Sequence, residues 1–279
     1  MATYRILVAA GAIGLLAAAG CSSNSTKSAT QPAKANTLPP SQAVQLAASL
    51  SQAETSLTAT IDVSMQGSIA MNSSGTVQEQ MKPTVFVNAN MSAVTVNGQT
   101  VPGGIQEILT PSTLYMRMHE LSQMTGKQWL KLPFSELSGL TGGVNLGQLI
   151  QQASSSEPTS QTELLTGASN VHMVGSSVID GVPVSEYTGT ISMRTALQRI
   201  PAAQRSQVSQ AISKAGIESA DFTVWLDAQH HARKLIIKEK GSSITETTTM
   251  QVTSIDQPVN TQLPPASQTA TIPASSLKS

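Results

Sequence analysis

The chain has 279 residues, and its 16 basic and 16 acidic side chains give a formal net charge of zero at neutral pH. This balance offers no electrostatic reason to expect nucleic acid or an anionic membrane surface as a partner. With one cysteine, the chain has neither an internal disulfide framework nor a thiolate metal site. Hydrophobic residues form 39% of the sequence, which is enough for one sizeable domain.

The first 20 residues have the pattern of an export signal. Arg5 precedes an apolar stretch at 6–20 that is too short to span a bilayer and that ends in small residues. Cys21 follows at once and resembles the lipidated cysteine in the lipobox of bacterial lipoproteins, although Ala18 stands where a lipobox favours Leu. We therefore expect cleavage after residue 20 and lipidation of Cys21. The alternative is an ordinary secretory signal with an incidental cysteine.

Three further regions follow the signal. Residues 21–40 combine the lipidated cysteine with a small, polar, proline-bearing tether. Residues 41–256 carry the hydrophobic periodicity of one folded domain. From 257 to 279 the chain is rich in Pro, Ser and Thr without periodicity, which predicts a disordered tail.

The domain is expected to begin with a helix. Ser41 follows two prolines and is the predicted N-cap. Apolar residues then recur at mostly three- and four-residue spacing as far as Leu57, near which the predicted amphipathic helix ends.

From residue 58 the hydrophobic period changes to two, which predicts strands. The expected strands of the first half lie at 58–71, 75–81, 85–93, 114–119 and 127–132. Asn97-Gly98 predicts a two-residue hairpin turn because both residues tolerate positive φ.

The middle of the chain changes character before strands resume. Helical spacing is predicted at 144–153 and again at 193–215, with an interruption at Pro201. The remaining expected strands lie at 170–179, 184–191, 222–227, 233–240 and 244–255, with a turn at Asp180-Gly181.

These elements add up to an α+β fold in which helices pack on one face of a large antiparallel sheet. A twisted sheet of this size is expected to curl into a half-barrel. Curling around the helices would leave an apolar cavity between sheet and helices.

Several segments of the second half resemble actinobacterial lipoproteins of the LppX/LprG type. The resemblance rests on the segments 170–175, 178–181, 187–191 and 220–227, which read NVHMVG, VIDG, YTGTI and ADFTVWLD. It extends from the lipobox to about Val259, by pattern more than by residues in the first half, and its motifs are turns and strand starts.

The resemblance implies a curved sheet wrapped on helices, similar to the LolA/LolB lipoprotein carriers. Members of this family hold acyl chains of glycolipids or wax-type lipids in an apolar cavity, while some relatives of the fold are sensors. It implies a lipid or glycolipid ligand, an envelope transporter or acceptor as partner, and no cofactor.

Alternating aliphatic and Met side chains are the candidate ligand-contacting residues. Lipid tails need apolar walls without unpaired polar atoms, and flexible thioethers adapt to chains of differing length. The alternative is that each residue only packs against the helices. The candidates are Ile61, Val63, Met65, Val85, Val87, Met91, Leu114, Met116, Met118, Val171 and Met173.

No catalytic or metal-binding set is predicted. Adjacent His230 and His231 would point to opposite sides of a strand and, with Asp227, are expected to form a polar hairpin turn. Lone His119 and His172 are expected at the surface. No serine lies in a Gly-x-Ser-x-Gly elbow, and the glycine cluster at 139–143 lacks the lysine of a phosphate loop and is expected to be a mobile loop.

The sequence therefore predicts a non-enzymatic lipoprotein anchored to the outer face of the cell membrane. Its expected role is to bind a lipid or other long apolar molecule and to carry or chaperone it. The alternative is a sensory or interaction module that uses the same fold to recognise a partner protein.

Overall fold

The computed structural model describes residues 38–67, 70–133, 165, 167–195, 209, 216–242 and 244–271. The predictions for Cys21, for the tether up to residue 37, for the helical segment at 144–153 and for the glycine cluster at 139–143 lie outside these residues. So does most of the segment at 193–215, of which residues 193–195 are helical.

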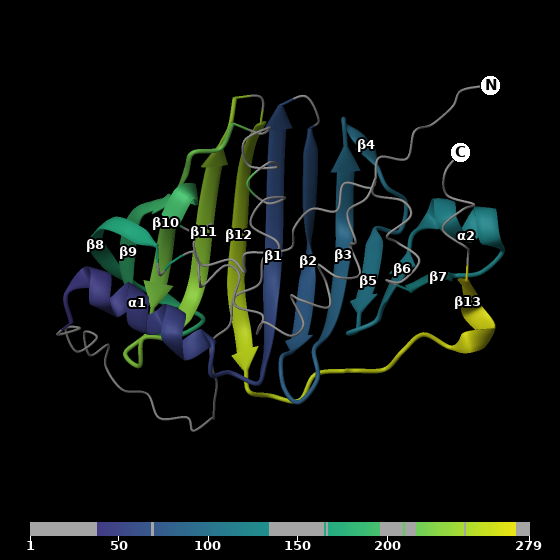
Figure 1. Cartoon of the computed structure of the whole chain (residues 1–279), viewed down its shortest axis with the longest axis horizontal. Helices are drawn as coiled ribbons and strands as arrows, with labels where there is room; N and C mark the ends of the chain where they lie inside the picture. Colours follow the sequence, from purple (N-terminus) through teal and green to yellow (C-terminus); the bar gives the residue numbers. More distant parts are fainter. Residues whose placement is uncertain are drawn as a thin grey trace.

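One long sheet of 13 strands dominates the structure and curves like half a barrel (Figure 1). Its order is β13-β7-β6-β5-β3-β2-β1-β12-β11-β10-β9-β8, with β4 paired to β3. All pairings are antiparallel except that of β13 with β7. The predicted α+β class and the large antiparallel sheet are confirmed.

The strands of the first half are β1 (Ser56–Gly67), β2 (Met71–Gln80), β3 (Phe86–Val96), β4 (Gln99–Thr100), β5 (Ile105–Leu109), β6 (Thr113–Arg117) and β7 (Trp129–Pro133). Those of the second half are β8 (Ala168–Ile179), β9 (Val182–Ser192), β10 (Ser219–Leu226), β11 (Ala232–Lys240), β12 (Ile244–Ile255) and β13 (Thr269–Thr271). The helical elements are α1 (Pro40–Ser51), α2 (His119–Thr125) and the 3-10 turn η1 (Ala266–Gln268).

Both predicted two-residue turns are confirmed. Asn97 and Gly98 have φ values of 50° and 78°, and Asp180 and Gly181 have 49° and 79°. Elements that were not predicted include β5, which has only five residues, and α2, which begins at His119 where a strand was expected to end. Met71, expected in the same strand as Ile61, instead begins the returning strand β2.

Helix α1 differs from its prediction at both ends. Pro39 is the N-cap and Pro40 the first helical residue, because a fixed φ near −65° suits that position, so Ser41 lies inside the helix and caps nothing. The helix ends at Ser51, and Leu57 belongs to β1. Its buried residues Ala43, Val44, Ala47, Ala48 and Ser51 form one stripe.

The two faces of the sheet are distinguished by which one carries the helices. Val44 of α1 belongs to a core cluster with Tyr187, Phe222 and Leu235, and Leu121 of α2 to one with Leu130 and Leu132. Strand register places all of these sheet residues on one face. We call this the inner face and the opposite one the outer face.

The prediction of a disordered tail is wrong for residues 257–271. This segment runs from the end of β12 along the ends of the central strands to the far edge of the sheet, where β13 pairs with β7 (Figure 1). Thr269 stands opposite Trp129, and the Lys127 ammonium donates a hydrogen bond to the Ser267 carbonyl at 2.8 Å. The segment has no hydrophobic periodicity, but backbone pairing to a sheet edge orders its end without needing such a pattern.

Candidate functional site

The inner face of strands β1, β2, β3, β5 and β6 is a continuous aliphatic surface. Register aligns Ala59 of β1 with Val77 of β2, and Val77 with Ala89 of β3. Ile61, Val77, Ala89, Met91 and Val94 form one buried cluster, with Val63, Val87, Val96, Val101 and Ile105 packed against it. These alternating positions face one way because successive side chains of a strand point to opposite sides.

Most predicted ligand-contacting residues lie together on this inner face. Register places Ile61, Val63, Met65, Val87, Leu114 and Met116 there, and Met91 belongs to the same buried cluster as Ile61. Met118 follows β6 and packs against Leu121 of α2 together with Leu114 and Met116. Alternation predicted which residues share a face within each strand, and register brings those faces of neighbouring strands together.

The remaining three predicted residues lie away from this central part of the inner face. Val85 immediately precedes β3 and is half-buried. Val171 is partly buried against the cluster that includes α1, and Met173 lies on the edge strand β8, where 45% of it is exposed. Met173 is therefore separated from the central aliphatic surface by the strands between β8 and β1.

Helices cover the two ends of the inner face rather than its centre, as far as the described residues go. Helix α1 lies in front of the strands near β8, and α2 lies at the opposite end beside β7 (Figure 1). Between them, Val63, Met65, Val87, Ile105 and Met116 are only partly buried. An apolar face with half-buried aliphatic side chains suits a hydrocarbon ligand.

Sequence reasoning missed four glutamates on this apolar face. They are Glu79 of β2, Glu107 of β5, Glu239 of β11 and Glu246 of β12. Glu79 stands opposite Leu57 and Val87, and Glu107 opposite Ala89 and Met116. Their signal was in the sequence, because each occupies a position whose parity is otherwise apolar, as in Val77-x-Glu79-x-Met81.

Glu79 is the most buried of these acids. Only 2% of the residue is exposed, and its Oε2 atom has no hydrogen-bond partner. Burial raises the pKa of Glu79 to about 8 because the interior disfavours the charged form. Burial, followed by the nearby Asp256 carboxylate, likewise raises the pKa of Glu54 to about 8 in the turn before β1.

Two further inner-face acids, Glu107 and Glu239, also have raised pKa values. Burial raises the pKa of Glu107. Burial and then repulsion by Glu246, its direct cross-strand neighbour, raise the pKa of Glu239. The inner-face positions paired in β1–β3, β5–β7 and β9–β12 carry these four acids and no Lys, Arg, His or Asp. Among these paired positions, every ionisable side chain is therefore an acid.

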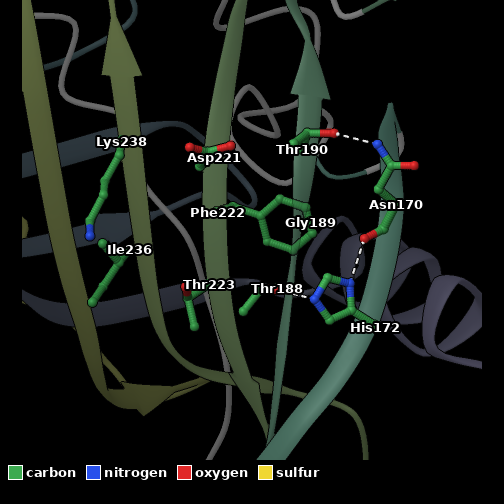
Figure 2. A pocket seen from close by; sticks show the side chains of 10 residues that line it. All are labelled: Asn170, His172, Thr188, Gly189, Thr190, Asp221, Phe222, Thr223, Ile236 and Lys238. Atoms are coloured by element: carbon green, nitrogen blue, oxygen red, sulfur yellow. Dashed lines mark hydrogen bonds between the residues drawn. The ribbon is translucent and has the colours of Figure 1, made fainter.

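A polar recess of about 300 Å³ lies on the outer face between β8 and β11 (Figure 2). His172 donates from Nδ1 to the Asn170 carbonyl at 2.9 Å, and its Nε2 is hydrogen-bonded to the Thr188 hydroxyl at 3.1 Å. Asn170 also bonds the Thr190 hydroxyl at 3.4 Å. These side chains satisfy one another in an open recess, so the arrangement needs no ligand.

The predicted polar turn at His230-His231 is confirmed. Asp227 is buried, and its Oδ1 accepts hydrogen bonds from the backbone N–H groups of Gln229 and His231, both at 2.9 Å. Its Oδ2 accepts from Arg233 Nε at 3.0 Å. Asp227 therefore holds the turn between β10 and β11. Within the described ranges, no three His, Cys, Asp or Glu residues are grouped as metal ligands.

The helices within the described ranges are all too short or too polar to cross a membrane.

Comparison with known sequences gives one limited match. No family model matches the chain. An uncharacterised 31.2 kDa protein of Streptomyces griseus is 25% identical over 105 residues, which are 37% of this chain. The match spans about a third of that protein's length (34%).

Solved structures similar to this chain include two mycobacterial lipoproteins. LppX of Mycobacterium tuberculosis is 18% identical, with 80% of this chain and 99% of that chain covered and a TM-score of 0.44. LprF of Mycobacterium bovis is 13% identical, with 81% and 96% covered and a TM-score of 0.47. A LolA superfamily protein of Nitrosomonas europaea is 10% identical, with 81% and 96% covered and a TM-score of 0.28. They are of the two kinds that the resemblance in the sequence named, actinobacterial lipoproteins and LolA-like proteins.

Proposed function

We propose that this chain is a lipid-anchored envelope protein that binds a lipid or other long apolar molecule on its inner face and carries or chaperones it. The observation that carries the proposal is the largely aliphatic inner face, on which Val63, Val87 and Met116 are only partly buried around a buried cluster that includes Ile61. A face of this kind favours a hydrocarbon ligand over a polar one.

The driving force would be apolar burial. Each methylene transferred from water contributes roughly 0.8 kcal/mol, so even a partly enclosed acyl chain is held without any charged contact. The half-buried Met65, Met116 and Met118 suit this task because thioether side chains adapt to chains of different length.

The proposed anchor defines where the ligand is collected. Two acyl chains on Cys21 would give durable attachment to the outer face of the cell membrane, and the tether at 21–40 would give the domain reach. A tethered carrier must pass its ligand to something nearby, so the proposal includes an envelope transporter or acceptor as partner.

The experiment is displacement of a fluorescent apolar probe by hexadecanol, with the full chain and two matched variants. Val63→Trp places a bulky ring on the half-buried inner face, whereas Val178→Trp places the same ring on strand β8, where Val178 is 55% exposed. We expect Val63→Trp to weaken binding by about tenfold or more, since the ring occupies the space of the chain, and Val178→Trp to leave it within about twofold.

Equal binding by the two variants would remove the central inner face from the proposal. Failure of the unmodified chain to bind any apolar probe would refute the function itself.

The second candidate function is partner recognition, and one observation favours it. Strand β8 is an edge of the sheet, and its Met173, Val174 and Val178 are 45%, 50% and 55% exposed. Edge strands with exposed apolar side chains invite pairing with another chain. Crosslinking in the envelope separates the candidates: a carrier yields bound lipid, and an interaction module yields a stable protein partner without lipid.

A further inference from the structure

The four inner-face glutamates pose a problem for a surface that binds only hydrocarbon. A buried polar group without a hydrogen-bond partner destabilises the folded state relative to one that is paired. The Glu79 Oε2 atom has no hydrogen-bond partner, and its cross-strand neighbours are Leu57 and Val87. An aliphatic residue at this position would make the fold more stable. The unpaired oxygen therefore points to a polar group that arrives with the ligand.

Glu79 and Glu107 are placed to act together. Only strand β3 separates β2 from β5, and the two residues lie one inner-face step apart along the strands. With strands about 4.8 Å apart, their Cα atoms are roughly 12 Å from each other. Two flexible glutamate side chains at that separation can contact one polar group or neighbouring groups on the same ligand.

The chemistry of that polar group follows from the charge of its surroundings. Glu239 and Glu246 lie at the other end of the strands, beside Met65, so a ligand group at this place meets only Glu79 and Glu107. The paired inner-face positions hold no base, so a carboxylate or phosphate buried there would have no counter-charge. Binding of an ammonium group would require the dehydration of both the ammonium and a carboxylate, and both dehydrations are unfavourable. A hydroxyl group avoids both costs, since a neutral carboxyl group donates one hydrogen bond to it and accepts another.

We propose that the inner face selects neutral, hydroxyl-bearing lipids over fatty acids, with Glu79 and Glu107 as the residues that bond the hydroxyl group. This inference rests on the proposed function and adds the class of ligand to it. It also places a polar part of the ligand against the sheet, among the aliphatic side chains, rather than leaving only hydrocarbon there.

The test is a matched series of ligands with one hydrocarbon chain: hexadecanol, hexadecanoate and hexadecylamine. Each displaces the same fluorescent probe from the full chain at neutral pH. We expect hexadecanol to bind about tenfold more tightly than hexadecanoate, a difference of about 1.4 kcal/mol.

Three variants assign that preference to residues. Glu79→Leu and Glu107→Leu keep an apolar surface but remove the carboxyl group, and each is expected to reduce the preference for hexadecanol several-fold. Glu79→Gln, which can still donate and accept hydrogen bonds, is expected to keep most of it and covers the case in which Glu79→Leu fails to fold. Glu120→Leu, on the exposed side of α2, is the control and should change nothing.

Several results would overturn the inference while leaving the proposed function intact. They are equal or tighter binding of hexadecanoate, tighter binding of hexadecylamine, and an unchanged preference in both leucine variants. If none of the three ligands binds, the proposed function fails, and this inference falls with it.

Discussion

At the scale of single residues, Glu79 is a feature with a measurable thermodynamic consequence. The folded chain holds its carboxyl group at a pKa of about 8, whereas an unfolded glutamate has the model value of 4.5. Between those values the folded chain binds more protons than the unfolded one, so the free energy of unfolding falls as pH rises. The loss is complete above about pH 8.

Glu79→Gln is expected to flatten this dependence. Glutamine stays neutral, so the variant lacks the share of the pH slope that comes from Glu79, on the order of 4 kcal/mol between about pH 5 and about pH 9. Urea unfolding at a series of pH values measures it, with the exposed Glu120→Gln as control. A variant profile that parallels the unmodified chain would show that Glu79 is ionised in the fold.

A second residue-scale prediction concerns Gly75, which has no room for a side chain. A Cβ atom there would lie 2.7 Å from the Met91 Cα atom and closer still to the Asn90 carbonyl oxygen, at the irregular pairing of β2 with β3. Gly75→Ala is therefore expected to lower the free energy of unfolding by about 1–3 kcal/mol.

Gly175 of β8 provides the matched control for that substitution. A Cβ atom at Gly175 would meet nothing within 4 Å, so Gly175→Ala should change stability by less than about 0.5 kcal/mol. Equal effects of the two substitutions in chemical denaturation would mean that β3 yields at the crowded site.

At the scale of elements, the C-terminal segment acts as a strap on the sheet. β13 covers the backbone edge of β7, which would otherwise be an open edge. A chain ending at residue 265 should therefore exchange the backbone amides of β7 faster by about tenfold or more in hydrogen–deuterium exchange.

The amides of β11 serve as the internal reference in that experiment, because one edge of β11 pairs with β10 and the other with β12. Their exchange should stay unchanged. Unaltered exchange in β7 after truncation would mean that the pairing with β13 contributes no protection.

Elements with a clear period were predictable from sequence, and those held by tertiary contacts were not. The strands at 233–240 and 244–255 were expected within one residue of β11 and β12, since alternation with turn residues on either side is a local signal. The strap and β5 pair through backbone bonds over only three and five residues, which leaves little pattern to read.

The candidate site was predictable in part for the same reason. The parity of Ile61, Val63 and Met116 followed from alternation alone, and register places them on one face. Glu79 and Glu107 were not predicted, because acidic side chains are ordinarily exposed and alternation alone does not indicate that an acid at an apolar position is buried.

At the scale of the whole molecule, the proposed anchor and the binding face are separate parts of one chain. Cys21→Ser should release the protein from the membrane fraction, because a single acyl acceptor is removed, and should leave displacement of the fluorescent probe unchanged. Immunoblotting of membrane and soluble fractions and the probe assay measure the two effects. Loss of binding together with the anchor would show that the domain depends on its attachment.

The most direct test of the account is the lipid that accompanies the protein when it is purified from the membranes of an actinobacterial host. Organic extraction removes a non-covalent ligand and leaves any lipid on Cys21 in place, so mass spectrometry of the extract counts the cargo alone. The account predicts about one long-chain, hydroxyl-bearing lipid per chain for the unmodified protein and strong depletion in Val63→Trp. An extract without lipid from the unmodified protein would contradict it.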